Sequence, residues 1–182
     1  VDGYTAATML GISAQDGYAS MPEAYTWSNA FFGLVPGSIG ETSTIAILLG
    51  LAILLVTKIA SYRIVGGVIL GTVVTSYFFN LVGSDTNPMF QMPFWWHMVM
   101  GGYAFGLVFM ATEPVSGSHT NAGRWIYGFV IGFMVIMIRV LNPAYPEGMM
   151  LAILFGNLLS PLIDHFVVSR NISYRNKVLN AK

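Results

Sequence analysis

The sequence predicts an all-α integral membrane protein with five transmembrane helices and a short re-entrant or interfacial half-helix in front of them. Of the 182 residues, 55% are hydrophobic and only 9% are charged, and the mean hydropathy is +0.66. A soluble domain carries about 25% charged residues, so this chain has too few to cover a water-facing surface. Its apolar residues fall into five segments close to the length of roughly 20 residues that a spanning helix needs.

The half-helix is expected at residues 30–35, an apolar stretch too short to span and interrupted by Pro36-Gly37. Irregular backbone is tolerated at membrane depth where it lines a protected cavity. Ser38-Ile39-Gly40-Glu41 has the spacing of a capping box, which predicts that the first span begins at Ser38. The five expected spans are 41–60, 62–82, 94–112, 125–141 and 148–168. Three regions follow: an N-terminal segment 1–40, a five-helix bundle 41–168 and a basic tail 169–182.

The basic residues predict how the chain is oriented in the membrane. With five spans, seven of the eight Lys and Arg residues fall on one side; they are Lys58, Arg63, Arg124, Arg170, Arg175, Lys177 and Lys182. The positive-inside rule makes that side cytoplasmic. The exception, Arg139, is near the end of the fourth span and is expected to extend to the interface. We therefore expect an inner-membrane protein with residues 2–8 in the periplasm and the C-terminus in the cytoplasm.

The odd number of spans predicts a relation to a longer protein. Many transport proteins consist of two halves with inverted topology, and no such repeat is visible within this sequence. We expect the chain to be one half of such a pair and a piece of a longer protein.

The N-terminal stretch Asp2-Gly3-Tyr4-Thr5-Ala6-Ala7-Thr8 contains the first candidate site. It resembles the acceptor sites of bacterial flavin transferases, in which the last Thr is esterified through its hydroxyl to the phosphate of FMN. Thr8 is therefore a candidate for covalent FMN. The alternative is an ordinary N-terminal loop with helix-capping residues, because small-residue Thr motifs are common.

The fifth span contains a second candidate site, for sodium. Asn157, Ser160 and Asp164 are spaced i, i+3 and i+7, so they share one helix face. Pro161 has no N–H and leaves the carbonyl of Asn157 without its helical donor. Oxygen ligands suit hard cations, and intramembrane acids are usually functional. The alternative is an interfacial Asp164 near the cytoplasmic end. Glu41 could likewise cap a helix or lie at a cation entrance.

Several function classes are excluded by what the sequence lacks. It contains no Cys, so disulfides, thiolate metal sites and Cys-ligated iron–sulfur clusters cannot form within it. It has no phosphate-binding loop, nicotinamide-binding motif or catalytic triad. No basic patch of the kind that binds nucleic acid is present, so no nucleic-acid partner is expected.

Taken together, these stretches resemble the B subunits of the bacterial sodium-translocating NADH:quinone oxidoreductases. The resemblance covers all 182 residues as the C-terminal half of such a chain. Besides the segment ending at Thr8, it rests on Pro36-Gly37-Ser38-Ile39-Gly40-Glu41-Thr42-Ser43, Ala111-Thr112-Glu113-Pro114-Val115-Ser116 and Asn142-Pro143-Ala144-Tyr145-Pro146-Glu147-Gly148-Met149-Met150-Leu151-Ala152-Ile153-Leu154. Ala6 stands where the flavin site more often has Gly, and Glu113 stands where Asp is usual.

The resemblance implies a membrane subunit with one FMN on the Thr that matches Thr8 and a second, non-covalent flavin, riboflavin. Such a protein passes electrons toward ubiquinone or menaquinone within a six-subunit complex that exports sodium. The resemblance implies a fold like that of urea and ammonium channels. NADH oxidation and the iron–sulfur centres would belong to other subunits, and the quinone-site residues largely to the N-terminal half.

Two other identities remain open from the sequence. The D subunit of the Rnf ferredoxin:NAD oxidoreductases shares the Thr site and the broken helix. Asn142-Pro143-Ala144-Tyr145 and Thr120-Asn121-Ala122-Gly123-Arg124-Trp125 are closer to the quinone reductase. A urea- or ammonium-type channel without a redox role is the alternative from another class. Bound flavin would distinguish the flavoproteins from the channel, and the electron donor would distinguish the first two.

Overall fold

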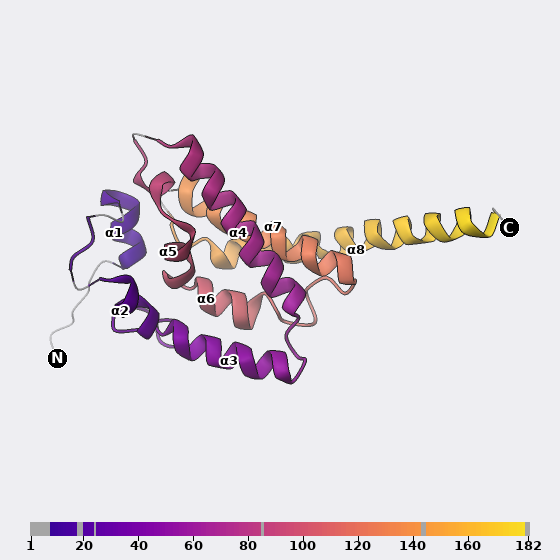
Figure 1. Cartoon of the computed structure of the whole chain (residues 1–182), viewed down its shortest axis with the longest axis horizontal. Helices are drawn as coiled ribbons and strands as arrows, with labels where there is room; N and C mark the ends of the chain where they lie inside the picture. Colours follow the sequence, from indigo (N-terminus) through magenta and orange to yellow (C-terminus); the bar gives the residue numbers. More distant parts are fainter. Residues whose placement is uncertain (1–7, 18–19, 24, 85, 143–144, 181–182) are drawn as a thin grey trace.

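The computed structural model describes residues 8–17, 20–23, 25–84, 86–142 and 145–180. All regular structure in these ranges is helical, which confirms the predicted all-α class (Figure 1). Residues 2–7 of the N-terminal motif lie outside the described residues. The elements are α1 (Met9–Asp16), α2 (Trp27–Phe32), α3 (Thr44–Val56), α4 (Tyr62–Val82), η2 (Pro88–Gln91), α5 (Phe94–Val99), α6 (Tyr103–Phe105), the π-helical turn η3 (Gly106–Met110), α7 (Asn121–Leu141) and α8 (Met149–Asn180).

Three described helices are long and apolar enough to cross a membrane: Tyr62–Val82, Asn121–Leu141 and the Met149–Leu179 part of α8. They match the second, fourth and fifth predicted spans. The helix α8 continues without interruption into the predicted tail as far as Asn180 and projects beyond the bundle (Figure 1). The apolar helix α3 has 13 residues, or roughly 20 Å at 1.5 Å per residue. Five full spans are therefore not confirmed.

The prediction that a capping box at Ser38 begins the first span is wrong. Ser38 and Glu41 form a turn instead, in which the Glu41 N–H donates to the Ser38 carbonyl at 3.2 Å. Gly40 has a φ of +85°, a left-handed conformation that ends any helical path through this segment. The helix α3 begins six residues after Ser38, at Thr44, and the Ser43 hydroxyl caps it by accepting from the Ala46 N–H at 3.4 Å.

The helices α4 and α7 pack against each other through glycines. Gly67 and Gly71 of α4 face Gly128 and Gly132 of α7, and backbone touches backbone there. A Cβ added at Gly67 would lie 2.7 Å from the Trp125 carbonyl oxygen, and one added at Gly132 would lie 2.8 Å from the Thr72 nitrogen. Small residues four apart permit such close approach in membranes.

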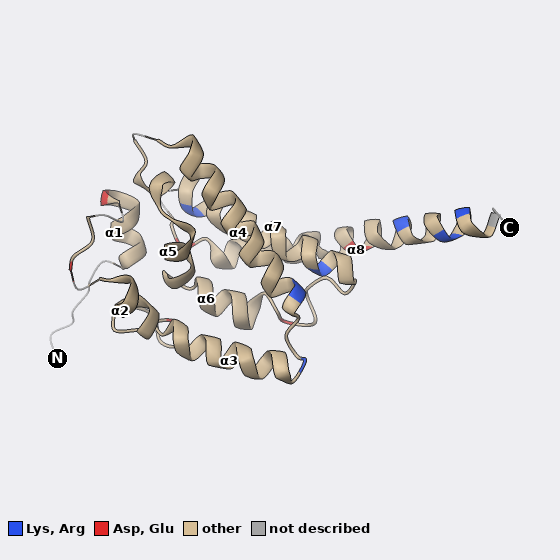
Figure 2. Ribbon diagram, viewed as in Figure 1, with Lys and Arg blue, Asp and Glu red and all other residues tan. Residues whose placement is uncertain are grey.

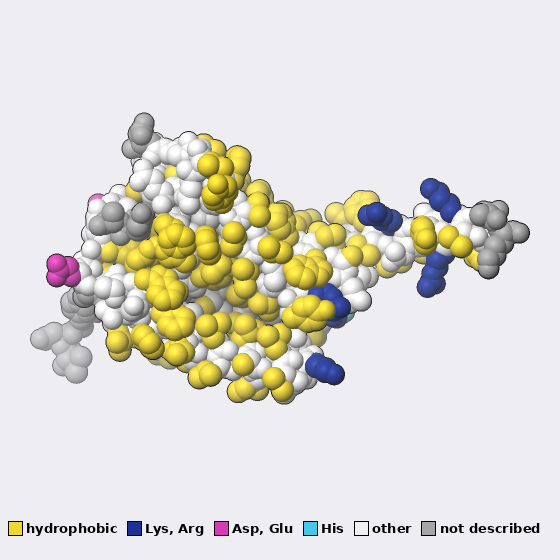
Figure 3. Space-filling model, viewed as in Figure 1, with side chains coloured by type: hydrophobic (Ala, Val, Ile, Leu, Met, Phe, Trp, Pro, Cys, Tyr) yellow, Lys and Arg dark blue, Asp and Glu magenta, His cyan; other side chains and the backbone are white. Residues whose placement is uncertain are grey.

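Charged and apolar side chains are separated as expected for a membrane protein. Figure 2 shows most of the basic residues at one end of the bundle and along the projecting part of α8. Arg139 is the exception and lies in the last turn of α7, toward the other end. Apolar side chains cover the visible face of the bundle (Figure 3). Large exposed ones such as Val56 and Leu81 lie on α3 and α4, where lipid can cover them.

The third predicted span, 94–112, is not one helix. The helix α5 ends at Val99, and the chain then passes through Gly101, which has a φ of +59°, before α6 and the π-helical turn η3. A left-handed residue breaks the i to i−4 hydrogen-bond ladder. The segment therefore leaves backbone carbonyls without helical donors, which is tolerated at membrane depth only where protein supplies the missing bonds.

Arg139 supplies those bonds. Its Nη1 donates to the His97 carbonyl at 2.7 Å and its Nη2 to the Met100 carbonyl at 3.0 Å. Its Nε donates to the carbonyl of Glu147 at 3.1 Å, and the side chain is fully buried. The expectation that Arg139 extends to the interface is wrong, because a guanidinium offers donors in a fixed fork and the interrupted helix offers acceptors that would otherwise be unsatisfied.

We predict that Arg139→Met destabilises the protein by about 2–5 kcal/mol, because carbonyls of the broken helix lose their buried donors. The thermal unfolding temperature of the purified protein in detergent should fall clearly. Arg170→Met, on the exposed part of α8, is the matched control and should leave it unchanged. Equal unfolding temperatures for the two variants would contradict the role given to Arg139.

Candidate functional site

Thr8 is the N-cap of α1. Its Oγ1 accepts a hydrogen bond from the Gly11 N–H at 3.1 Å, and the residue is exposed. A hydroxyl is favoured at this position because it satisfies one of the free N–H groups of the first turn. The capping alternative raised from the sequence therefore describes the local geometry. Capping uses a lone pair of the oxygen, and the exposed side chain remains open to a modifying enzyme.

A pocket next to Thr8 brings together three of the segments on which the resemblance rests. Its walls come from the start of α1, the loop between α2 and α3, the break after α5 and the loop before α8. The enclosed space is about 60 Å³, room for a few atoms but not for a flavin ring system. The lining residues are Thr8, Met9, Leu10, Val35, Pro36, Gly37, Ser38, Glu41, Thr42, Val99, Met100, Gly101 and Glu147.

Two carboxylates flank the broken helix in this pocket. Glu147 accepts a hydrogen bond from the Gly102 N–H at 3.1 Å through Oε2. A Cβ added at Gly101 would lie 2.8 Å from Oε1 of Glu147, and one added at Gly102 would lie 3.2 Å from Oε2 of Glu41. The two glycines therefore let both carboxylates approach the backbone.

The charge of this region favours cations. Glu41 and Glu147 also line an adjoining pocket of about 180 Å³ with Ser38 and Gly102. No described residue that lines either pocket is basic. Opposite charges attract and like charges repel at these short distances, so the two carboxylates favour a cation and disfavour a phosphate, although the guanidinium of Arg139 behind Glu147 offsets part of their charge. A flavin phosphate on Thr8 would have to point away from them.

Asp164 clamps the start of α7. Its Oδ1 accepts from the Ser118 hydroxyl at 2.6 Å and from the hydroxyl and N–H of Thr120 at 2.6 and 3.1 Å. Its Oδ2 accepts from the His119 N–H at 2.8 Å. Thr120 is the N-cap of α7, so a carboxylate on α8 fixes the loop that leads into α7. A sodium ion at Asp164 would have to replace some of these hydrogen bonds.

Asn157 and Ser160 lie on α8 as predicted, but Asn157 has its own partner. Its Oδ1 accepts from the Tyr127 hydroxyl of α7 at 2.5 Å. Ser160 is buried, and Pro161 lies inside a helix that continues past it. Among the described residues, no group of three or more His, Cys, Asp or Glu could hold a metal ion. A sodium role for Asp164, Asn157 and Ser160 stays a prediction.

Sequence reasoning missed Glu147 and the break at Gly101-Gly102. Two signals pointed there: adjacent glycines in the middle of an expected span, and an Arg in the membrane with no acid on its own helix. The third glycine of this segment, Gly106, has a packing role, because its Cβ position is filled by Met149. The pairing between the break and Arg139 joins residues 39 and 42 positions apart, so no local pattern reveals it.

Comparison with known proteins places this sequence in a family. The model of the NQR2, RnfD, RnfE family matches residues 1–173. A protein of Azotobacter vinelandii is 62% identical over 176 residues, which cover 96% of this chain and 44% of the relative. One of Chromohalobacter salexigens is 57% identical over 176 residues, which cover 97% and 43%.

Both relatives are named as the B subunit of a Na(+)-translocating NADH-quinone reductase. The chain spans less than half of their length. The matched range nevertheless extends over nearly all of the sequence and includes the positions of Thr8, Pro36-Gly37, Arg139 and Glu147. The chain belongs to the NQR2, RnfD, RnfE family.

Proposed function

We propose that this chain is part of the membrane subunit of a sodium-pumping NADH:quinone oxidoreductase. In this role it carries FMN on Thr8 and relays electrons toward quinone, coupled to sodium export. The observation that carries the proposal is the 62% identity to the B subunit of such a reductase over nearly the whole chain. The exposed hydroxyl of Thr8 supports it, because a phosphoester requires an accessible oxygen.

The bound flavin would supply reversible one- and two-electron chemistry, and the chain would fix its position. The helix α1 holds Thr8 at its N-terminus, and the acidic pocket beside it disfavours the phosphate. The flavin would therefore extend from Thr8 across the outer surface of the protein rather than into the bundle. Riboflavin, the second flavin of the proposal, has no assigned residues here.

Sodium handling is supported by the acidic groups at the two ends of the bundle. Glu41 and Glu147 flank the broken helix near Thr8, and Asp164 lies at the basic end. Interrupted helices with free backbone groups are the usual ion sites of membrane transporters. The other five subunits of the proposed complex would complete the path.

The names of the relatives favour the quinone reductase over the D subunit of an Rnf complex, although one family model includes both. A urea- or ammonium-type channel is a weaker proposal. The described bundle is filled by side chains such as Tyr103, Tyr127 and Arg139, which are fully buried.

The attachment of FMN to Thr8 is tested by separating the two roles of this residue, as flavin acceptor and as helix cap. Thr8→Ala removes both the hydroxyl and the helix cap, whereas Thr8→Asn keeps a capping oxygen but cannot form a phosphoester. We expect both variants to insert and to lose all in-gel flavin fluorescence after denaturation. Thr5→Ala should keep the fluorescence. Covalent flavin in the Thr8→Asn protein would refute the assignment.

The proposed orientation is tested with a reporter that is active only outside the cytoplasm. Fused after Lys182, it should be silent, because the basic side chains at that end favour the cytoplasm. The same reporter fused before Val1 is the matched control and should be active. Activity of the C-terminal fusion would reverse the orientation and place the flavin segment inside.

The sodium role of Asp164 is tested by comparing the loss of its charge with the loss of one hydrogen bond. We expect Asp164→Asn to raise the KM for sodium in quinone reduction several-fold with flavin content unchanged, since Asn keeps an acceptor but not the charge. Ser118→Ala removes one of the hydrogen bonds that Asp164 accepts and should change the KM for sodium little. Equal effects of the two substitutions would mean that Asp164 only positions the loop before α7.

A further inference from the structure

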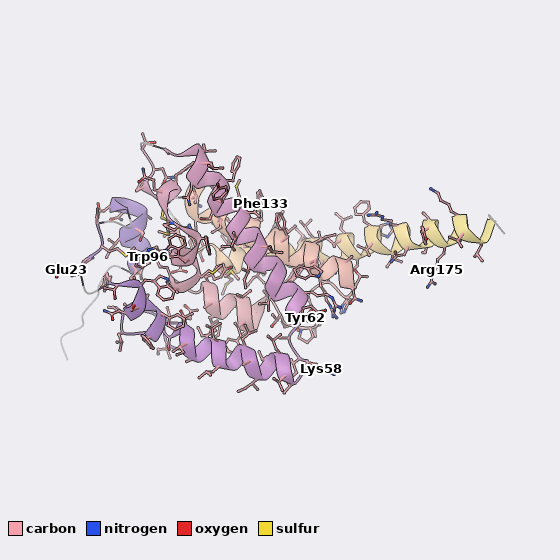
Figure 4. All side chains as sticks on the ribbon, viewed as in Figure 1. Glu23, Lys58, Tyr62, Trp96, Phe133 and Arg175 are labelled. Carbon is pink, nitrogen blue, oxygen red and sulfur yellow. The ribbon has the colours of Figure 1, made fainter. Side chains whose placement is uncertain are left out.

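A large cavity lies at the basic end, away from the candidate flavin site. It has a volume of about 590 Å³ and is formed by the α3–α4 connection, the 112–118 loop and the first turn of α7. Small-molecule sites typically enclose about 300–1,000 Å³, so this cavity is large enough for a ligand. Figure 4 labels Lys58 and Tyr62 beside it, at the ends of α3 and α4.

The cavity is positively charged. Lys58, Arg63 and Arg124 line it together with one acid, Glu113, which gives a net charge of +2 when all four are ionised. The Glu113 carboxylate is engaged locally: Ser116 donates to it through its hydroxyl and N–H, and Val115 through its N–H. These hydrogen bonds, that of the Ser116 hydroxyl first, lower the pKa of Glu113.

The two arginines keep their charge available. Arg124 donates Nε to the Ser118 carbonyl at 3.3 Å, which leaves the outer nitrogens of its guanidinium for another group. The Arg63 guanidinium lies 4.7 Å from the centroid of the Tyr62 ring. Neither contact neutralises a charge. Both arginines are half-buried, so a phosphate between them would be partly shielded from water, where a charged hydrogen bond is stronger.

Ser61 adds an unsatisfied polar group to the same wall. Its Oγ is buried and has no hydrogen-bond partner among the described residues, although Ser61 is the N-cap of the 21-residue helix α4. A buried hydroxyl without a protein partner is rare in folded proteins. The first N–H groups of α4 also lack a side-chain cap, and the positive end of a long helix adds to the attraction for an anion.

Part of the remaining wall is apolar. Leu55, Ile59 and Ile64 line the cavity, and Val56 at the end of α3 and Ile59 in the connection after it are exposed. A free phosphate would not use these walls. An amphiphile would, with its phosphate among the basic groups and its chains along α3. Basic pockets between membrane helices are known to take anionic lipid headgroups.

We propose that this cavity binds the phosphate headgroup of an anionic phospholipid, held by Arg63 and Arg124. The site is separate from Thr8 and does not depend on the proposed redox role, and it adjoins the Asp164 clamp through Ser118, which lines the cavity and donates to Asp164. The lipid would join the α3–α4 connection to the loop before α7.

The test uses the purified complete complex in nanodiscs of phosphatidylcholine, with a photoactivatable phosphatidylglycerol as the probe. We expect labelled peptides from 55–64 and 112–124. Labelling should fall about tenfold or more in Arg63→Gln/Arg124→Gln, since each basic group near the membrane surface contributes to anionic-lipid binding. The control Arg170→Gln/Arg175→Gln removes two charges from the same end, on exposed α8, and should reduce labelling less than about twofold.

Further arms of the experiment distinguish the source of the phosphate. Excess inorganic phosphate should leave most of the label in place; its full removal would identify a free anion as the ligand and overturn the lipid assignment. Equal labelling by a photoactivatable phosphatidylcholine would show a groove for acyl chains alone and would also overturn the lipid assignment.

The variant Arg63→Lys/Arg124→Lys keeps both charges and should restore labelling at least in part, which separates loss of charge from misfolding of the Gln variant. Equal losses in the Gln variant and in the α8 control would contradict the proposal as well.

Discussion

The buried guanidinium of Arg139 is the interaction on which the functional end of the molecule depends. An interrupted helix at membrane depth has free carbonyls, and each one without a donor is costly. Arg139 donates to the carbonyls of His97 and Met100 on one side of the break and to that of Glu147 in the loop before α8. One side chain of α7 thus connects α5 to the loop before α8. Its hydrogen bonds make the break possible, because apolar packing between helices alone would leave these carbonyls without donors.

The break in turn determines the chemistry of the neighbouring pocket. Gly101 and Gly102 have no side chains, so the carboxylates of Glu147 and Glu41 lie against the backbone there. Because the pocket also includes Thr8, residues from four separate segments meet at one end of the bundle. An acidic pocket next to a flavin-acceptor candidate suits the coupling of electron transfer to cation movement, which agrees with the proposed function.

The other end of the bundle is organised by a second polar clamp. Asp164 of α8 binds the loop that begins α7 through Ser118, His119 and Thr120. Asp164 can approach the loop only because position 123 is a glycine, since a Cβ there would lie 2.6 Å from Oδ1 of Asp164. With the glycine contacts between α4 and α7 in the middle, the core of the bundle is fixed at both ends and at its centre. The short apolar helix α3 packs outside this core (Figure 1).

The sequence by itself determined the membrane class, the helices α4, α7 and α8, the gathering of basic residues at one end and the family. These features follow from the composition and from continuous apolar segments, because a single long apolar segment is enough to favour a helix in the membrane. Only the tertiary structure decided that 94–112 is broken, that α3 begins at Thr44, that Arg139 is buried and that Glu147 joins the site near Thr8. Each of these depends on hydrogen bonds or close contacts between segments far apart in the chain, and the free energy of such contacts has no local signature in the sequence.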